Sequence, residues 1–165
     1  MEGNKNKSRA LLIFGAPCSG KTTFSTKFAK KFGLAYYDFD ELLKDGFTRK
    51  NLMTILELLT RTKQTLIIEG GLNTEEQRKE IREILRKYNY DPSLIWIQTD
   101  ASTIRKRLKT RFKDVSKAKG VYENAVKEIE APTEVERPII LSGKHTFETQ
   151  TRHVVTGLAE LNEVK

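Results

Sequence analysis

The stretch GAPCSGKT at residues 15–22 decides the fold of this chain, because it matches the phosphate-loop pattern GxxxxGK[ST]. A short apolar run, Ala10–Phe14, precedes it and is typical of a strand buried on both faces. After it, phenylalanines recur every fourth residue until Gly33, which indicates a helix with one apolar face. Such a loop needs this setting between a strand and a helix, so we predict a phosphate-binding loop at a helix N-terminus.

The backbone and the side chains of this loop have separate expected roles. The glycines let consecutive N–H groups curl around phosphate oxygens, Lys21 supplies a positive charge for the β- and γ-phosphates, and the Thr22 hydroxyl can ligate Mg²⁺. Cys18, the one cysteine, could act as a redox thiol, but its position in the loop mainly requires backbone shape. We therefore expect ATP and Mg²⁺ as cofactors. The residues expected to bind the nucleotide are Gly15, Ala16, Pro17, Cys18, Ser19, Gly20, Lys21, Thr22 and Thr23.

The rest of the chain alternates short apolar runs with helical stripes, an order that favours a parallel sheet covered by helices on both faces. After the first strand, further strands are expected at residues 34–37, 65–68, 94–99 and 139–141. We predict a three-layer α/β/α P-loop NTPase fold with a five-stranded parallel sheet, in a single domain of residues 1–165. Residues 113–137 are charged and punctuated by glycine and proline, and we predict a mobile, irregular lid there, with a short helix near residues 122–129.

Composition limits the cellular setting. No run of eighteen apolar residues occurs, and the N-terminal residues lack a hydrophobic stretch, so neither a membrane span nor a signal peptide is expected. A single cysteine cannot form an internal disulfide and fits a reducing compartment. We therefore expect a cytoplasmic protein without a membrane partner, of unknown oligomeric state.

The net charge of +8 is concentrated in one segment. Residues 101–127 carry nine basic and two acidic side chains, whereas residues 128–136 carry four acidic and no basic ones. A basic block indicates a polyanionic ligand, either the phosphates of a nucleotide or a nucleic acid. A solvated, lysine-rich helix face is the alternative explanation.

Acidic residues follow the second and third expected strands. Asp38 and Asp40 come after one strand and Glu69 after the next, so all three lie at the carboxyl edge, where open α/β sheets bind ligands. The two aspartates point in different directions, so one could face Mg²⁺ and the nucleotide while the other positions and deprotonates an acceptor hydroxyl. Glu69 is placed like a Walker B acid that holds Mg²⁺. Acids at a helix N-terminus and a strand-ending turn are the structural alternatives.

Two glycines and two arginines add to this site. Gly70 and Gly71 would let a ligand approach the backbone closely. Arg107 and Arg111 lie one helical turn apart, so both can reach the same side and meet phosphates or stack on a base. A lid arginine would neutralise the charge that phosphoryl transfer spreads over three oxygens.

With these features together, the chain resembles the small P-loop kinases related to shikimate kinase, gluconate kinase and the nucleoside monophosphate kinases, with an AAA-type ATP-binding, kinase-like domain. The resemblance covers essentially the whole length. It rests on the phosphate loop, on the motif YDFD that contains both aspartates, on the motif RLKTR before a charged lid, and on the short length. It implies that Asp38 lies near Mg²⁺ and that Asp40 contacts the acceptor. It also implies that Arg107 lies near the base and Arg111 near the phosphates.

Departures from these families concern the acceptor. Leu72 stands where shikimate kinases have a third glycine, which argues against shikimate. The segment EGGLNTEEQ is similar in spacing to a stretch of adenylate kinase whose glutamine reads the acceptor base, and Gln77 occupies that place. Asn73 replaces the arginine that grips the acceptor's phosphate there, which leaves a neutral acceptor such as a nucleoside or a sugar. Gln77 also has capping-box spacing with Thr74, a structural alternative.

The sequence therefore predicts an ATP-dependent phosphotransferase that moves the γ-phosphate to a hydroxyl of a small metabolite. A 5′-hydroxyl nucleic-acid kinase and a non-catalytic nucleotide-binding module are the alternatives, whereas a GTPase is disfavoured because no N-K-x-D motif occurs. Trp96 is expected in the core, and His145 is expected to be incidental. The expected catalytic residues are Lys21, Asp38, Asp40 and Arg111; the expected metal ligands are Thr22, Asp38 and Glu69; the expected acceptor contacts are Asp40, Gly70, Gly71 and Gln77.

Overall fold

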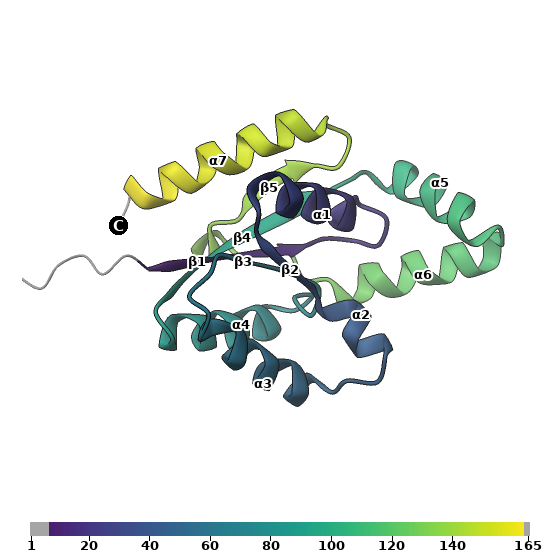
Figure 1. The fold of residues 1–165 in the computed structure, drawn as a ribbon. Coiled ribbons are helices and arrows are strands. Elements are labelled where there is room, and N and C mark those ends of the chain that lie inside the picture. Colours follow the sequence, from purple (N-terminus) through teal and green to yellow (C-terminus); the bar gives the residue numbers. More distant parts are fainter. Residues whose placement is uncertain (1–6, 164–165) are drawn as a thin grey trace, which may run out of the picture.

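The structure is a computed structural model that describes residues 7–163. Its centre is a five-stranded sheet with the order β2-β3-β1-β4-β5, in which every strand runs parallel to its neighbours (Figure 1). The strands are β1 (Ser8–Phe14), β2 (Ala35–Asp38), β3 (Leu66–Glu69), β4 (Tyr90–Gln98) and β5 (Ile139–Ser142). The predicted α/β class and five-stranded parallel sheet are confirmed.

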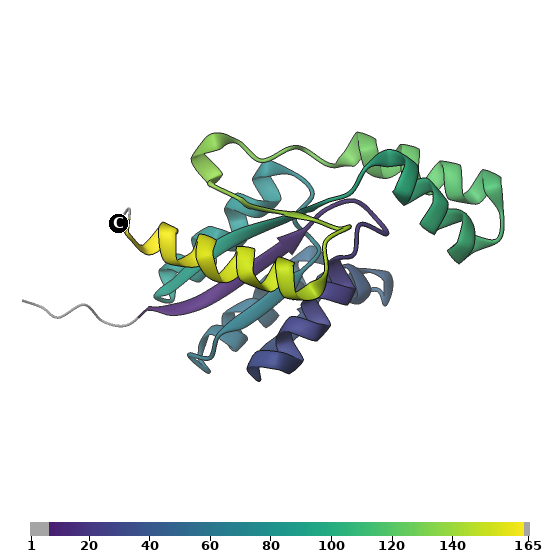
Figure 2. The same cartoon turned by 90° about the horizontal axis from the view of Figure 1, so that it is seen from above.

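Helices cover both faces of the sheet, which gives the three expected layers (Figures 1 and 2). Helices α1 and α7 pack on one face, and α3 and α4 pack on the other. Helices α5 and α6 extend away from the sheet as a pair, which we call the basic hairpin (Figure 2). The helices are α1 (Lys21–Phe32), α2 (Phe39–Lys44), α3 (Arg49–Thr60), α4 (Glu75–Lys87), α5 (Ala101–Phe112), α6 (Val115–Glu128), the 3₁₀ helix η1 (Glu134–Glu136) and α7 (Phe147–Glu163).

The central strand β1 shows how the sequence produces this layering. Leu11 and Ile13 pack into the cluster beneath α1 and α7. Ala10, Leu12 and Phe14 pack into the cluster beneath α3 and α4. All five side chains are at most 1 % exposed. A strand buried on both faces reads as a continuous apolar run, as this one does.

Strand β4 is longer than the sequence predicted. It begins at Tyr90 rather than at residue 94 and contains Pro92, although proline lacks the backbone N–H that a strand interior normally uses. Pairing with β5 starts only at Ile95, so Pro92 lies on the half of β4 that has β1 as its one partner strand. A missing donor is tolerated there.

The short helix expected near residues 122–129 is present, but the irregular structure expected just before it is wrong. Helix α6 runs from Val115 to Glu128 and packs against α5 around Ala118, which is 3 % exposed. Its buried positions are held by small residues among many charges, so the apolar stripe was weak. Gly120 lies inside this helix without ending it. The rest of residues 113–137 is irregular: the two residues before α6, and the stretch between α6 and β5 apart from η1.

Among the helices within residues 7–163, none combines the length and the apolar composition that a membrane crossing needs.

Candidate active site

The phosphate loop, Gly15–Thr22, connects β1 directly to α1, as its pattern predicts. Its backbone adopts positive φ angles at Gly15 (151°), Cys18 (60°) and Gly20 (107°). A Cβ atom on Gly15 would collide with the Ile97 carbonyl of the adjacent strand, so this position requires glycine. Gly20 is the N-cap of α1, and no side chain caps the first N–H groups of that helix. These donors are available to an anion such as a phosphate group.

Lys21, the first residue of α1, folds back over the loop. Its Nζ donates hydrogen bonds to the carbonyl oxygens of Gly15 (2.9 Å) and Ala16 (3.1 Å). Burial lowers the pKa of the Lys21 ammonium below its ordinary value of 10.5, while nearby carboxylates, Glu69 foremost, act in the opposite direction. The cation is thus held against the concave side of the loop, where phosphate oxygens would replace the carbonyls.

Glu69 links the phosphate loop to the end of β3. Its Oε1 accepts a 2.6 Å hydrogen bond from the Thr22 hydroxyl, and its Oε2 accepts a 3.1 Å hydrogen bond from the Tyr36 hydroxyl. Glu69 is 2 % exposed, and burial raises the pKa of its carboxyl, although the hydrogen bond from Thr22 lowers it. Burial and the adjacent carboxylates raise the pKa of Tyr36, so the phenol stays protonated and donates.

Asp38 ends β2 and caps α2. Its Oδ1 accepts a 3.0 Å hydrogen bond from the N–H of Glu41, and its Oδ2 lies 3.5 Å from the Tyr36 hydroxyl. The sheet register pairs Asp38 with Glu69. The structural alternative of an acid at a helix N-terminus therefore holds for Asp38, which caps α2. The same residue still stands beside Glu69 at the carboxyl edge, so its proposed metal role stays a prediction.

Asp40 lies in the first turn of α2 and faces the turn that follows β3. Its Oδ1 accepts a 2.9 Å hydrogen bond from the N–H of Gly71, while its Oδ2 has no hydrogen-bond partner within residues 7–163. Gly70 and Gly71 have positive φ angles of 82° and 65°, and a Cβ atom on Gly70 would lie 2.6 Å from Oδ1 of Asp40. Gly70 therefore leaves room for the Asp40 carboxylate, and Gly71 binds it through its N–H. This is a structural role in addition to the expected contact with an acceptor.

The oxygen atoms at this edge fit a magnesium ion. Thr22, Asp38 and Glu69 offer hydroxyl and carboxylate oxygens, the ligands that Mg²⁺ prefers. In the described part of the chain, no group of three or more His, Cys, Asp or Glu side chains is arranged to hold a metal by itself. A magnesium ion would therefore also need oxygens from water and from the phosphates of a nucleotide, which is its usual mode of binding.

Of the two arginines expected near the ligand, Arg107 reaches the phosphate loop. Its Nη1 donates to the carbonyl of Cys18 (3.0 Å), and its Nη2 donates to the carbonyl of Gly143 after β5 (3.1 Å). Arg107 thereby joins the basic hairpin to both loops. Arg111 is exposed in the last turn of α5, with its guanidinium 5.8 Å from the centre of the Phe112 ring, and it makes no hydrogen bond to the loop.

A buried ion pair that the sequence did not reveal fixes the segment between α6 and β5. Arg78 of α4 is 0 % exposed and donates from Nε and Nη2 to the two carboxylate oxygens of Glu136, at 2.8 and 3.0 Å. Burial opposes ionisation of Glu136, but the hydrogen bonds from Arg78 and from the Thr133 N–H, together with the charges of Arg78 and Arg82, outweigh it, so the pKa of Glu136 is lowered. Arg78 Nη1 also donates to the carbonyls of Leu72, Asn73 and Glu130. In the sequence, the acidic residues within 128–136 were the feature that could have indicated a buried ion pair in this segment.

Gln77 has the capping role that its spacing indicated. Its Oε1 accepts hydrogen bonds from the N–H groups of Asn73 (2.9 Å) and Thr74 (3.3 Å), which completes a capping box at the start of α4. The structure therefore explains Gln77 without a ligand, and its contact with an acceptor stays a prediction.

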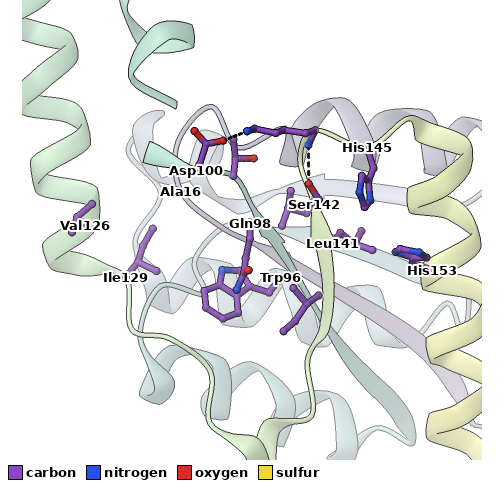
Figure 3. Close-up of a pocket in the computed structure, with 14 residues that line it drawn as sticks. Ala16, Trp96, Gln98, Asp100, Val126, Ile129, Leu141, Ser142, His145 and His153 are labelled. Atoms are coloured by element: carbon purple, nitrogen blue, oxygen red, sulfur yellow. Dashed lines mark hydrogen bonds and ion pairs between the residues drawn. The ribbon is translucent and has the colours of Figure 1, made fainter. Parts of the chain in front are cut away.

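A pocket of about 840 Å³ lies beside the phosphate loop, between the sheet and α6 (Figure 3). Ala16 of the loop lines it. Trp96, expected in the core, is only partly buried: its ring stacks on Phe14 with centroids 5.7 Å apart, and it also borders the pocket. His145 lies at the far rim, edge-to-face with His153 at 5.8 Å.

Comparison with known proteins adds the family. The chain matches the family model described as "AAA domain" over residues 11–135. A comparison with curated proteins finds no match. The fold matches a gluconokinase from Sinorhizobium meliloti 1021 with a TM-score of 0.71 at 15 % identity, covering 96 % of both chains.

Other solved structures share this fold. A shikimate kinase from Aquifex aeolicus matches with a TM-score of 0.59 at 17 % identity, covering 91 % of this chain and 96 % of that one. Kti12 from Chaetomium thermophilum, solved in complex with ADP-AlF3, matches with a TM-score of 0.69 at 16 % identity, covering 92 % and 97 %. At such identities these likenesses show the fold alone. Together with the family match, they confirm that the chain belongs to the AAA domain family and has a P-loop kinase-like nucleotide-binding fold.

Proposed function

We propose that this protein is an ATP-dependent phosphotransferase that moves the γ-phosphate of ATP to a hydroxyl group of a small metabolite. The observation that supports this most is that Lys21 lies near two carboxylates, Glu69 and Asp40, which have different surroundings at the carboxyl edge of the sheet. Glu69 is tied to the phosphate loop through Thr22, as a metal-holding residue would be. Asp40 is held with one oxygen free, as a residue that receives an acceptor hydroxyl would be.

In the proposed transfer, different residues bind the phosphates, hold the metal and accept the proton. The loop N–H groups and Lys21 bind the phosphates, and Thr22, Asp38 and Glu69 would hold Mg²⁺, which neutralises phosphate charge when it is bound. Asp40 orients the acceptor hydroxyl through its free Oδ2 and takes the proton of that hydroxyl as the oxygen attacks the γ-phosphorus, while the bond from that phosphorus to the bridging oxygen breaks and ADP leaves. The Gly71 N–H fixes the carboxylate, so it need not reorient for the reaction.

The arginines have different positions in this proposal. Arg107 already bridges the phosphate loop and the Gly143 loop through hydrogen bonds. Its guanidinium would therefore lie beside the base of a bound nucleotide. Arg111 would act on the phosphates only if the basic hairpin moved toward the loop. Its assignment as a catalytic residue thus requires a lid motion. In other phosphotransferases, substrate binding causes such a closure.

The test is phosphorylation by the purified protein with ATP and Mg²⁺, using a panel of nucleosides, sugars and polyols and detecting products by mass. Lys21→Met should remove nucleotide binding. Asp40→Asn should keep nucleotide binding and lower transfer by about a hundredfold, the lower end of general-base effects. Tight ATP binding without transfer to any acceptor would instead support the non-catalytic nucleotide-binding module.

A 5′-hydroxyl nucleic-acid kinase is the second candidate, and one observation favours it. The basic hairpin exposes several cations that form no ion pair with its own acids: Arg105, Lys106, Lys109, Arg111, Lys113 and Lys117. Such a surface could follow a phosphate backbone. Retention of a labelled oligonucleotide with a 5′-hydroxyl that weakens steeply with salt, followed by its phosphorylation, would establish this function; no retention at low salt would exclude it.

A further inference from the structure

The pocket beside the phosphate loop has an apolar floor. Trp96 on β4 and Ile140 on β5 are paired in the sheet register, so their side chains share one face. Val126 and Ile129, at the end of α6, border the same space (Figure 3). Ile140 is 52 % exposed and Val126 is 55 % exposed. Apolar side chains left uncovered in a hollow next to a reaction site are typical of a ligand pocket.

The lining of this pocket becomes more polar toward the phosphate loop. Gln98 and Ser142 are the next register pair on the same face, closer to the carboxyl edge. Ala16, whose carbonyl accepts a hydrogen bond from Lys21, lines the pocket near that edge. A molecule with an apolar ring and a hydroxyl-bearing end would therefore lie with its ring toward Trp96 and its hydroxyls toward the phosphates.

Two arginines on this face of the sheet and one lysine at the rim of the pocket already have partners. Arg78 is paired with Glu136 through two hydrogen bonds. Arg49 donates to Glu80 at 2.6 Å, and its other nitrogens donate to backbone carbonyls. At the rim of the pocket, Lys144 forms an ion pair with Asp100 at 2.5 Å.

Anionic acceptors are therefore disfavoured. A carboxylate placed against the apolar floor would lose hydration without gaining a guanidinium partner, because breaking either arginine pair would strand a carboxylate of the protein.

We propose that the acceptor of this protein is a neutral, hydroxyl-bearing molecule with a flat ring, such as a nucleoside, and that the ring packs against Trp96. This inference rests on the proposed phosphotransfer and names its acceptor class. It separates the protein from acceptors that carry a carboxylate, such as gluconate and shikimate. The aromatic side chain supplies dispersion and stacking, and the pair Gln98 and Ser142 supplies hydrogen bonds.

The chain has one tryptophan, so its fluorescence reports on this pocket directly. With ADP and Mg²⁺ at saturation to fill the donor site, the protein is titrated with thymidine, ribose, gluconate and shikimate. Thymidine should quench or shift the Trp96 emission saturably, and the other three should not. A response to gluconate or shikimate as strong as that to thymidine, or no response to thymidine, would overturn the proposal.

Variants add a readout that does not depend on fluorescence. By calorimetry, Trp96→Leu should weaken thymidine binding at least about fivefold, the lower end of base–aromatic stacking, while Trp96→Phe should retain most of it. Ile140→Ala in the pocket should also weaken binding. Val155→Ala, at a side chain of similar exposure (51 %) on α7 and outside the pocket lining, should leave binding unchanged. Melting temperatures show whether each variant is folded.

Two outcomes separate this inference from the proposed function. Phosphorylation of an acceptor whose KM is the same in the wild type and in Trp96→Leu would keep the phosphotransferase and reject the ring pocket. Saturable thymidine binding that depends on Trp96 and Ile140, without transfer to any acceptor, would keep the ring pocket and count against phosphotransfer.

Discussion

The Thr22 hydroxyl lies 2.6 Å from Oε1 of Glu69, so the first turn of α1 and the last residue of β3 are joined by one hydrogen bond. Both oxygens are suitable ligands for Mg²⁺. Because Glu69 is nearly fully buried and also bonded to Tyr36, its position is set before any ligand arrives. A metal ion bound here would take the place of the Thr22 hydroxyl hydrogen as the positive partner of the Glu69 carboxylate.

The first prediction concerns magnesium. Glu69→Gln keeps the size of the side chain and a hydrogen-bond acceptor for Thr22 but removes the charge. The gain in ATP affinity on adding Mg²⁺ should fall by about tenfold, whereas the affinity in the presence of a chelator should change little. Isothermal titration calorimetry measures both, with the exposed Glu41→Gln as the control variant. Equal magnesium dependence in Glu69→Gln and the wild type would contradict a metal role.

The second prediction concerns pH and the stability of the ligand-free protein. Burial raises the pKa of Glu69 in the folded state above its ordinary value of 4.5. The stability that this group contributes is therefore fully present below pH 4.5 and is lost as the pH rises through the raised pKa. Glutamine does not ionise, so the melting temperature of Glu69→Gln minus that of the wild type should increase from pH 4.5 to neutral pH. A difference independent of pH would show that Glu69 is not perturbed.

The third prediction concerns Lys21, whose charge is held in a partly dehydrated position. Burial lowers its pKa, so at neutral pH, below the ordinary value of 10.5, ionisation costs the folded state free energy. Lys21→Met should therefore raise the melting temperature of the ligand-free protein, because methionine fills a similar space without a buried charge. The variant should lose the further rise that ATP gives the wild type. A lower melting temperature would mean that the bonds to Gly15 and Ala16 outweigh the burial cost.

The phosphate loop and the lid show which features the sequence could predict. Residues 15–22 are a local signal, because the glycines, the lysine and the flanking strand and helix are contiguous in the chain. The first half of helix α6 was missed because its buried side chain, Ala118, is small and surrounded by charges. Its apolar face becomes visible only against α5, since packing rather than propensity stabilises most helices.

Pairs that are distant in sequence were beyond prediction. Arg78 and Glu136 are 58 residues apart, and each reads as an ordinary surface charge on its own. Likewise, Trp96 carries the apolar pattern of a core strand, and its place beside a pocket follows from the fact that α6 leaves the space over β5 uncovered. The edge of the sheet where Asp38, Asp40 and Glu69 meet was predictable, because parallel strands share one carboxyl edge.

The fourth prediction concerns the Arg78–Glu136 pair. Glu136→Gln leaves a fully buried guanidinium without its counter-charge and should lower the free energy of unfolding by about 3–5 kcal/mol. The exposed pair Lys79–Glu83 provides the control, since Glu83→Gln should cost less than about 1 kcal/mol. Urea denaturation followed by circular dichroism measures both. A double variant, Arg78→Met with Glu136→Leu, should be more stable than Glu136→Gln, and an equal loss in both would mean that shape rather than charge is at stake.

The fifth prediction concerns the close contact between the loop after β5 and the phosphate loop. A Cβ atom on Gly143 would collide with the Thr99 hydroxyl and the Ser19 carbonyl, and the Gly143 carbonyl also receives a hydrogen bond from Arg107. Gly143→Ala should therefore displace the phosphate loop and weaken ATP binding by about tenfold or more, as misplacement of a binding group by a fraction of an ångström does. Calorimetric titration with ATP measures this effect.

Gly120→Ala is the matched control for this change. Gly120 lies within α6 and a Cβ atom there would meet nothing within 4 Å, so alanine should leave ATP binding intact. It should also stabilise the protein by about 0.5–1 kcal/mol, because glycine is unfavourable inside a helix. If Gly143→Ala and Gly120→Ala bound ATP equally well, the loop after β5 would have no part in shaping the phosphate site, and the bond from Arg107 to Gly143 would serve only to hold the basic hairpin.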